Sequence, residues 1–218
     1  MDPAQLNLVA CNIHQFFMIS GPKYKICKRL GGAVFEKCQT QKFTLSEARA
    51  GKKKGKRGGQ MSDYKRQLFE KQKMRFSYGI SEKQLSRYVQ ESIEHTEDPS
   101  KALVGRLESR LDNVMYRLGI AKTRRLGRQM VSHGHIIING KRTTIPSYRV
   151  RLNDVVSIRE GSKQSPLFLD LSERIELGSI PTWLALDLKA GTGKVVTEPS
   201  IATETLFDPE QVFEYYSR

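Results

Sequence analysis

Apolar side chains recur at helical intervals in two stretches that follow residue 62. The first runs from about residue 63 to residue 78, starts beside the capping side chains of Ser62 and Asp63, and stops at Gly79; its apolar positions are Tyr64, Leu68, Phe69 and Phe76. The second follows Ser81, which forms a capping box with Gln84, and its stripe consists of Leu85, Tyr88, Val89, Ser92 and Ile93. We therefore predict two helices that form a hairpin.

A third helical pattern begins at Ser100, after the helix-breaking pair Asp98-Pro99. Its apolar stripe comprises Leu103, Val104, Leu107, Leu111, Val114, Met115 and Leu118. Beside the stripe, polar side chains recur at spacings of four, three and four residues, which places them on one helix face: Arg106, Arg110, Asn113 and Arg117. We predict one continuous helix with a ridge of guanidinium groups on its surface.

A short fourth helix is predicted from about residue 122 to residue 133, before Gly134. The apolar run at 136–138 and the turn signal Asn139-Gly140 then predict a strand hairpin, and a second strand pair is expected around a turn at Asn153-Asp154. Residues 105–160 therefore predict a module of two helices and a small β-sheet. The expected fold class is α+β, with this module inserted in a helical domain that carries an N-terminal basic arm.

The remaining segments complete the expected domain plan. Ser165-Pro166 predicts another helix start, with Leu167, Phe168, Leu171 and Ile175 on one face. Asp208-Pro209 predicts a short last helix that packs Val212, Phe213 and Tyr216 onto the body. The expected parts are an extension at 1–20, a basic, partly irregular arm at 21–60, a first helical part at 61–104, the module at 105–160 and a return to the helical domain at 161–218.

The positive charge of the chain is confined to two blocks. The 218 residues include 37 Lys and Arg against 23 Asp and Glu, a formal net charge of +14. Residues 21–78 hold 17 basic and 4 acidic side chains, and residues 101–160 hold 13 and 4. This segregation favours a nucleic-acid partner over a charge that only aids solubility. In the first block, residues 51–59 read GKKKGKRGG and are expected to become ordered on phosphates, through Lys52, Lys53, Lys54, Lys56 and Arg57.

Membrane, metal and cofactor sites are not expected. No apolar run approaches the roughly 20 residues that span a bilayer, and residues 1–20 lack the features of a signal peptide, so we expect a soluble cytoplasmic protein. Cys11, Cys27 and Cys38 are expected to be reduced thiols, because they are an odd number in a chain without a secretion signal. They also lack the close pairing of structural zinc ligands.

An enzyme is not expected either, and no small-molecule substrate. Glu108 and Asp112 lie in a basic helix, where ion pairing explains them, and His133 lies at a helix end that favours a dipole or phosphate contact. Charge alone leaves open a DNA-binding protein and a free-standing RNA-binding regulator. A distorted RNA helix suits guanidinium groups on rigid helices better than base readout in a DNA groove does.

Three stretches, GRLESRLDNVMYRLG, TRRLGRQMVSHGHIIINGKR and NDVVSIRE, together resemble the RNA-binding module named after the fourth protein of the small ribosomal subunit. With SDYKRQLFEKQKMRFSYGISEKQLSRY, PTWLALD and EYYSR, in the same order, the resemblance extends to the bacterial form of that ribosomal protein over roughly residues 19–218. It implies a structural constituent of the small subunit, a primary rRNA-binding protein that nucleates assembly of the subunit body. It further implies contact with the fifth protein near the messenger entry channel, and a part in translational accuracy shared with the fifth and twelfth.

The resemblance also implies which side chains face RNA. They are Arg106, Arg110, Asn113, Arg117, Thr123, Arg124, Arg125, Arg128, Ser132, His133, Asn139, Lys141 and Arg142, and the basic face of the fourth helix adds Lys122. On this interpretation, alanine at Arg110 or Arg124 weakens RNA binding and leaves thermal stability nearly unchanged. Two features depart from the family: some members hold zinc with four cysteines where only Cys27 and Cys38 stand here, and residues 1–17 match nothing, which makes Met18 the expected initiator.

Overall fold

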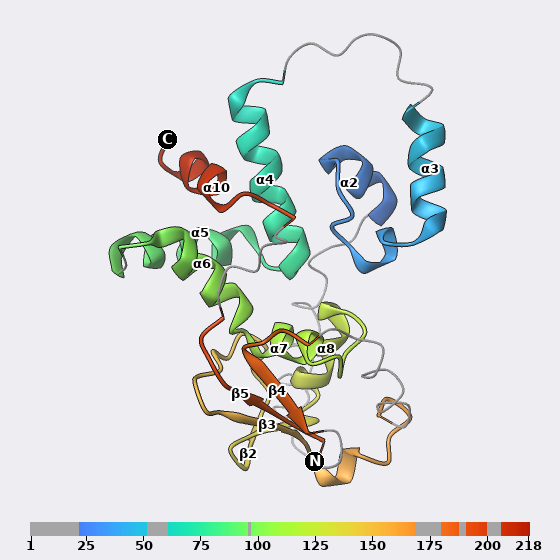
Figure 1. Ribbon diagram of the computed structural model, residues 1–218, viewed down its shortest axis with the longest axis vertical. Helices are drawn as coiled ribbons and strands as arrows, with labels where there is room; N and C mark the ends of the chain where they lie inside the picture. The colour runs from blue at the N-terminus through green and yellow to red at the C-terminus, as the bar shows by residue number, and fades with distance from the viewer. Residues whose placement is uncertain (1–21, 52–60, 96, 169–179, 188–190, 200–205) are drawn as a thin grey trace, which may run out of the picture. The chain divides into compact units, whose positions relative to one another are not determined.

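The computed structural model describes residues 22–51, 61–95, 97–168, 180–187, 191–199 and 206–218. The chain divides into two compact units, one formed by residues 1–87 with 206–218 and the other by residues 88–205. Helices make up the described part of the first unit, whereas the second combines helices with an antiparallel sheet (Figure 1). The predicted α+β class is confirmed.

The first unit begins with α2 (Lys23–Leu30), the 3-10 helix η2 (Glu36–Cys38) and α3 (Gln41–Gly51). These elements enclose a small apolar cluster of Cys27, Leu30, Val34, Phe35, Cys38 and Phe43. Both cysteines are buried free thiols, and burial followed by a hydrogen bond with Cys27 raises the pKa of Cys38 to about 12. Among the described residues, no group of three or more His, Cys, Asp or Glu side chains lies close enough to hold a metal ion.

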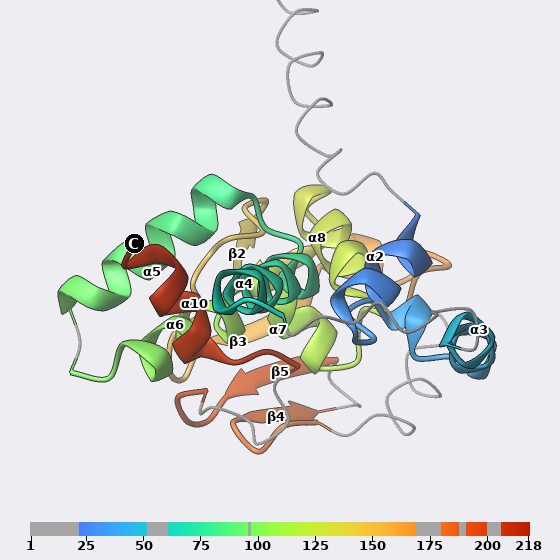
Figure 2. The ribbon, with the colours of Figure 1, turned by 90° about the horizontal axis from the view of Figure 1, so that it is seen from above.

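The two helices predicted after residue 62 are confirmed as α4 (Asp63–Tyr78) and α5 (Glu82–His95). Gly79 ends α4 with a left-handed φ of 62°, and the Ser81 hydroxyl accepts a hydrogen bond from the Gln84 amide at 3.1 Å. The predicted apolar stripe is wrong at Tyr64 and Ile93, which are 50% and 54% exposed. The helix that packs along α4 is α10 (Pro209–Tyr216), as Figure 2 also shows in a view along α4.

The predicted last helix is therefore confirmed. Asp208 caps α10 by accepting a hydrogen bond from the Glu210 amide at 3.0 Å, and Val212 is completely buried. Gln67 on α4 donates to the Glu214 carboxylate at 2.7 Å. These contacts fasten the C-terminal segment to the first unit.

The prediction of one continuous third helix is wrong. In the second unit, α6 (Pro99–Glu108) and α7 (Leu111–Arg117) are separate helices, and Arg110 between them has an extended backbone. The Leu111 amide donates to the Tyr148 carbonyl, and the Val150 amide donates to the Ser109 carbonyl, both at 2.9 Å. A bridge between distant parts of the chain thus replaces the helical hydrogen bonds at this point.

The fourth helix is confirmed as α8 (Arg124–Ser132), capped by Thr123, and the hairpin is confirmed as β1 (Ile136–Ile138) and β2 (Lys141–Thr143). Asn139 and Gly140 adopt φ values of 49° and 79°, as the tight turn requires. The prediction of a strand pair around Asn153-Asp154 is wrong. Instead β3 (Val155–Ile158) pairs with β1 and with β5 (Thr192–Val195), while β4 (Leu184–Asp187) pairs with β5. The sheet order is β2-β1-β3-β5-β4.

Residues 184–195 were expected in the return to the helical domain, yet their strands extend the sheet that starts at the hairpin. The core of this unit lies between the sheet and the helices α7 and α8, and includes Leu111, Met115, Leu118, Met130, Ile136 and Trp183. A 3-10 turn, η3 (Glu160–Ser162), follows β3, and the helix predicted after Ser165 falls mostly on residues 169–179, outside the described residues.

Candidate nucleic-acid interface

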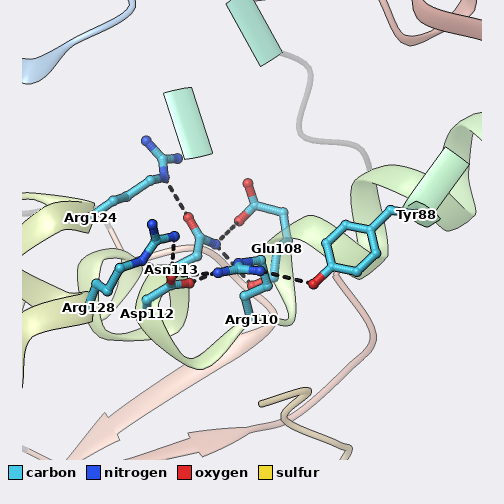
Figure 3. A network of polar contacts seen from close by, with 7 residues as sticks. All are labelled: Tyr88, Glu108, Arg110, Asp112, Asn113, Arg124 and Arg128. Atoms are coloured by element: carbon cyan, nitrogen blue, oxygen red, sulfur yellow. Dashed lines mark hydrogen bonds and ion pairs between the residues drawn. The ribbon is translucent and has the colours of Figure 1, made fainter. Parts of the chain in front are cut away.

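Most of the residues predicted to face RNA in the second unit gather on or beside α7, α8 and the β1–β2 hairpin. Helices α7 and α8 pack closely side by side (Figure 1). Gly127 on α8 permits this approach, since a Cβ atom there would lie 2.6 Å from the backbone oxygen of Asp112. The packing brings the side chains that start both helices into one polar network (Figure 3).

One half of the network centres on Asp112, whose side chain is 3% exposed. Arg110 donates to both carboxylate oxygens, from Nε at 3.0 Å and from Nη2 at 2.7 Å. Arg128 on α8 donates to Oδ2 of the same carboxylate from Nε at 3.0 Å and Nη2 at 2.7 Å. The third donor of Arg110, Nη1, reaches the hydroxyl of Tyr88 on α5 at 2.9 Å.

Arg110 is therefore not part of an exposed ridge, and this prediction is wrong. Its side chain is 3% exposed, because the interruption between α6 and α7 turns it inward onto Asp112 and Tyr88. Burial lowers the pKa of Arg110, but the nearby Asp112 carboxylate outweighs this effect, and the net result is a pKa above the usual value. The guanidinium stays charged as a structural group.

The other half centres on Glu108, which ends α6. Arg117 donates to the two carboxylate oxygens of Glu108, from Nε at 2.9 Å and from Nη2 at 2.7 Å. Asn113 donates to Oε2 of Glu108 at 2.8 Å and accepts from Nε of Arg124 at 2.7 Å through its own Oδ1. The amide of Asn113 is buried and thus links an acid on α6 to an arginine on α8.

We call Glu108 and Asp112 the carboxylate base, and Arg117, Arg124 and Arg128 the outer arginines. The side chains of the base are 6% and 3% exposed, whereas those of Arg117 and Arg128 are 31% and 24% exposed. The guanidinium of Arg124 also lies over the ring of Tyr116, 4.5 Å from its centroid. Two acids thus face four guanidinium groups, counting Arg110, so the network keeps an excess of positive charge.

Arg106 lies apart from this network. Its Nη2 pairs with Glu91 at 2.6 Å, and its guanidinium lies 5.3 Å from the ring centroid of Tyr88. It lines an open groove of about 1480 Å³ between α5, α6 and residues 148–152, where Glu97, Asp98 and Glu198 add negative charge. The predicted alignment of Arg106 with Arg110 and Arg117 does not occur, because the helix is interrupted between them.

The other predicted residues of α8 and the hairpin divide into exposed and structural groups. Those exposed to solvent are Lys122, Arg125, His133, Lys141 and Arg142. Thr123 caps α8, and Ser132 is half-buried in its last turn. Asn139 donates to Asp154 at 2.8 Å and accepts from the Val155 amide at 2.9 Å, so its side chain fixes the hairpin to β3.

Some charged residues near the interface were not predicted. Arg149, Arg151 and Arg159 are exposed in the second unit, and the basic count of residues 101–160 already included them without giving them a place. The carboxylate base was interpreted as structural ion pairing, which the geometry confirms. The predicted phosphate-binding lysines and arginine of the arm, residues 52–57, lie outside the described residues.

Two histidines stand beside the hairpin. The rings of His133 and His135 stack at 6.0 Å with an interplanar angle of 15°, and Nδ1 of His135 lies 2.9 Å from the Ser162 hydroxyl. Burial, followed by the nearby His133, Arg142 and Arg159, lowers the pKa of His135. Its ring is therefore harder to protonate than a free imidazole, because the environment is positively charged.

Across the helices of the described residues, none is both long and apolar enough to cross a membrane. Two family models match the chain: one described as the S4 domain covers residues 109–156, and one described as the ribosomal protein S4/S9 N-terminal domain covers residues 18–111. The first therefore coincides with α7, α8 and the strands up to β3, which hold most of the interface.

Curated relatives match nearly the whole chain. The small ribosomal subunit protein uS4 of Persephonella marina is 42% identical over 200 residues, which cover 90% of this chain and 97% of that protein. The protein of the same name from Aquifex aeolicus is 39% identical over 206 residues, covering 91% and 97%. That of Thermotoga maritima is 38% identical over 205 residues, covering 91% and 98%. With this identity over this length, the chain belongs to the uS4 family of small ribosomal subunit proteins.

Proposed function

We propose that this chain is a primary rRNA-binding constituent of the small ribosomal subunit, which nucleates assembly of the subunit body and contributes to translational accuracy. The observation that carries the proposal is the cluster of guanidinium groups that α7 and α8 hold in fixed positions within the S4 domain. Members of the uS4 family are structural proteins of the ribosome and not enzymes.

The proposed RNA surface consists of residues that can reach a phosphate. We assign direct contacts to the outer arginines and to the exposed side chains of α8 and the hairpin, which are Lys122, Arg125, His133, Lys141 and Arg142. The buried Arg110 and Asn113 instead support this surface from below, because their polar atoms are engaged within the protein. The exposed Asn139 supports it by fixing the hairpin to β3. Guanidinium groups on rigid helices suit the irregular phosphate positions of a folded RNA junction.

Further partners belong to the same proposal. The fifth small-subunit protein is the proposed direct neighbour, and the twelfth shares the accuracy function. The basic arm at 51–59 is proposed to bind rRNA phosphates through its five cations. Support for these points comes from the family and from the charge of the sequence.

A free-standing RNA-binding regulator would use the same module, so the test must separate the two functions. We expect the native protein to sediment with small subunits at low and moderate salt, and subunits assembled without it to lack a compact body. Recovery of the protein only in ribosome-free fractions would favour the regulator. Tighter binding to a DNA duplex than to a folded rRNA junction at equal salt would contradict both RNA functions.

A further inference from the structure

We propose that the carboxylate base positions the outer arginines for RNA before RNA binds. Glu108 and Asp112 are then positioning residues, which act on RNA only through other side chains. This inference rests on the proposed function and deepens it, because it identifies what gives the guanidinium groups their fixed geometry.

The charge of the base is unfavourable for RNA binding when it is considered alone. A carboxylate close to a phosphate repels it, so two acids inside a basic block lower the attraction for a polyanion. Both acids are nonetheless almost completely buried at the junction of α6 and α7, beneath the outer arginines. Any favourable contribution that they make to RNA binding therefore comes through the geometry of the arginines.

The orientation of the arginine side chains is fixed both at Glu108 and at Asp112. Arg117 and Arg128 each present Nε and Nη2, one edge of the planar guanidinium, to a carboxylate at distances between 2.7 and 3.0 Å. An edge held by two hydrogen bonds fixes the plane and the direction of the whole group. An arginine that is already ordered loses less side-chain entropy when it binds a phosphate.

Glu108 reaches one arginine further through Asn113. The carboxylate accepts from Nδ2 of Asn113, which leaves Oδ1 of that amide facing Arg124. An amide with both ends engaged cannot flip, so the charge of Glu108 sets the direction of Nε in Arg124. Two buried acids thus determine the orientation of arginines on two different helices.

The decisive variant is Glu108→Gln, which keeps the shape of the side chain and removes its negative charge. The Gln amide has a single acceptor oxygen, which can replace Oε2 of the carboxylate, but its NH2 group would face Nη2 of Arg117 donor to donor where Oε1 now accepts. Because Arg117 would then lose the second hydrogen bond that fixes its plane, we expect affinity for a folded small-subunit rRNA transcript to fall about 3- to 10-fold. The matched control is Glu160→Gln, which removes the same charge from a side chain that is 87% exposed. The control is expected to bind equally or slightly more tightly, and the same result for Glu108→Gln would overturn the inference.

A double-mutant cycle separates positioning from general stability. In an Arg117→Ala, Arg124→Ala background, Glu108→Gln is expected to cost no further affinity, because the arginines through which it acts are gone. A structural role would lower affinity by the same factor in both backgrounds, and that outcome would overturn the inference. Thermal unfolding of each variant verifies that the protein is folded at the assay temperature.

A second measurement needs no variant. The Nε–H groups of Arg117 and Arg124 are expected to be ordered in NMR relaxation of the free protein and to stay ordered with RNA. Mobile groups in the free protein would overturn the inference. If the wild-type protein shows no preference for small-subunit rRNA, the proposed function itself fails; if it binds and only the Glu108 results disagree, the inference alone fails.

Discussion

Arg110 carries a positive charge at a place that is almost sealed from water, where Asp112 and Tyr88 satisfy its donors. Removing one partner of a buried ion pair typically costs 3–5 kcal/mol. Because Arg128 still neutralises Asp112 after the change, we expect Arg110→Ala to lower the free energy of unfolding by about 3 kcal/mol, at the lower end of that range. Chemical denaturation measures this, with the exposed Arg125→Ala as the control, expected within about 0.5 kcal/mol of wild type. Equal stability of the two variants would contradict the structure.

The sequence placed Arg110 and Arg125 in the same class, because both lie outside the apolar stripe. Periodicity separates apolar from polar faces, but it cannot distinguish a face in water from one covered by polar neighbours. The difference depends on the backbone bridge to residues 148–150, which no local pattern encodes. The exposure to solvent of Lys122, Lys141 and Arg142 agrees with their position outside the apolar pattern, whereas their contact with RNA stays a prediction.

At the scale of elements, the local sequence was sufficient to predict a helix end or a turn where the residues at that place form the cap or the turn themselves. The Gly79 end of α4, the Ser81 cap of α5, the Asp208 cap of α10 and the Asn139-Gly140 turn are short-range features, and all four were predicted. The predicted cap of α4 is wrong, because Ser62 makes no side-chain hydrogen bond to the helix start, and the Thr123 cap of α8 was not predicted. The interruption between α6 and α7 was missed because the apolar spacing runs through it unchanged. Strands β4 and β5 were missed because each has only four residues, and β5, on which β4 pairs, gains its own place in the sheet from β3, far away in sequence.

The approach of α7 to α8 depends on Gly127. A Cβ atom there would collide with the backbone oxygen of Asp112, so Gly127→Ala is expected to force the helices apart and to destabilise the protein by about 1–3 kcal/mol. Gly105→Ala within α6 is the matched control, because its nearest neighbour would lie 3.6 Å away, an ordinary contact. Alanine favours a helix by about 1 kcal/mol over glycine, so the control is expected to be neutral or stabilising in thermal melts. A loss of stability only in the control would contradict this packing.

Glu82, at the start of α5, connects that helix to α4 and α10. It accepts from Lys71 at 2.5 Å and from the Tyr216 hydroxyl at 2.8 Å, and although burial raises the pKa of Glu82, these partners produce a net lowering. A carboxyl with a lowered pKa in the folded state stabilises the protein above its unfolded pKa, and this contribution is lost as the pH falls. We therefore expect Glu82→Gln to flatten the decline of melting temperature below about pH 4.5. An unchanged acid profile would show that the contact adds no stability.

At the scale of the whole molecule, the chain leaves the first unit before residue 88 and returns to it after residue 205. The return was predicted, but residues 184–187 and 192–195 belong to the sheet, so the fold of the second unit depends on sequence well beyond the S4 domain at 109–156. Truncation after residue 205 removes α10 and exposes the face of α4 that it covers. We expect this truncation to destabilise the first unit while the near-native amide spectrum of residues 109–156 persists. Loss of both units together would show that they fold as one cooperative body.

The two basic blocks are expected to contribute differently to RNA binding. A chain segment without apolar side chains adds electrostatic attraction, whereas rigid guanidinium groups add a preference for the RNA shape that matches them. Replacing the five cations of residues 52–57 by Gln should therefore reduce the salt dependence of binding by about three to five counterions and leave the preference for rRNA over an unrelated folded RNA nearly intact. Replacing Arg124 and Arg125 by Ala should reduce the salt dependence by about one or two counterions but also lower that preference. Filter binding of both RNAs at several salt concentrations measures the two quantities together. If the arm variant lost the preference and the α8 variant kept it, recognition would reside in the arm, and the fixed network at α7 and α8 would serve stability alone.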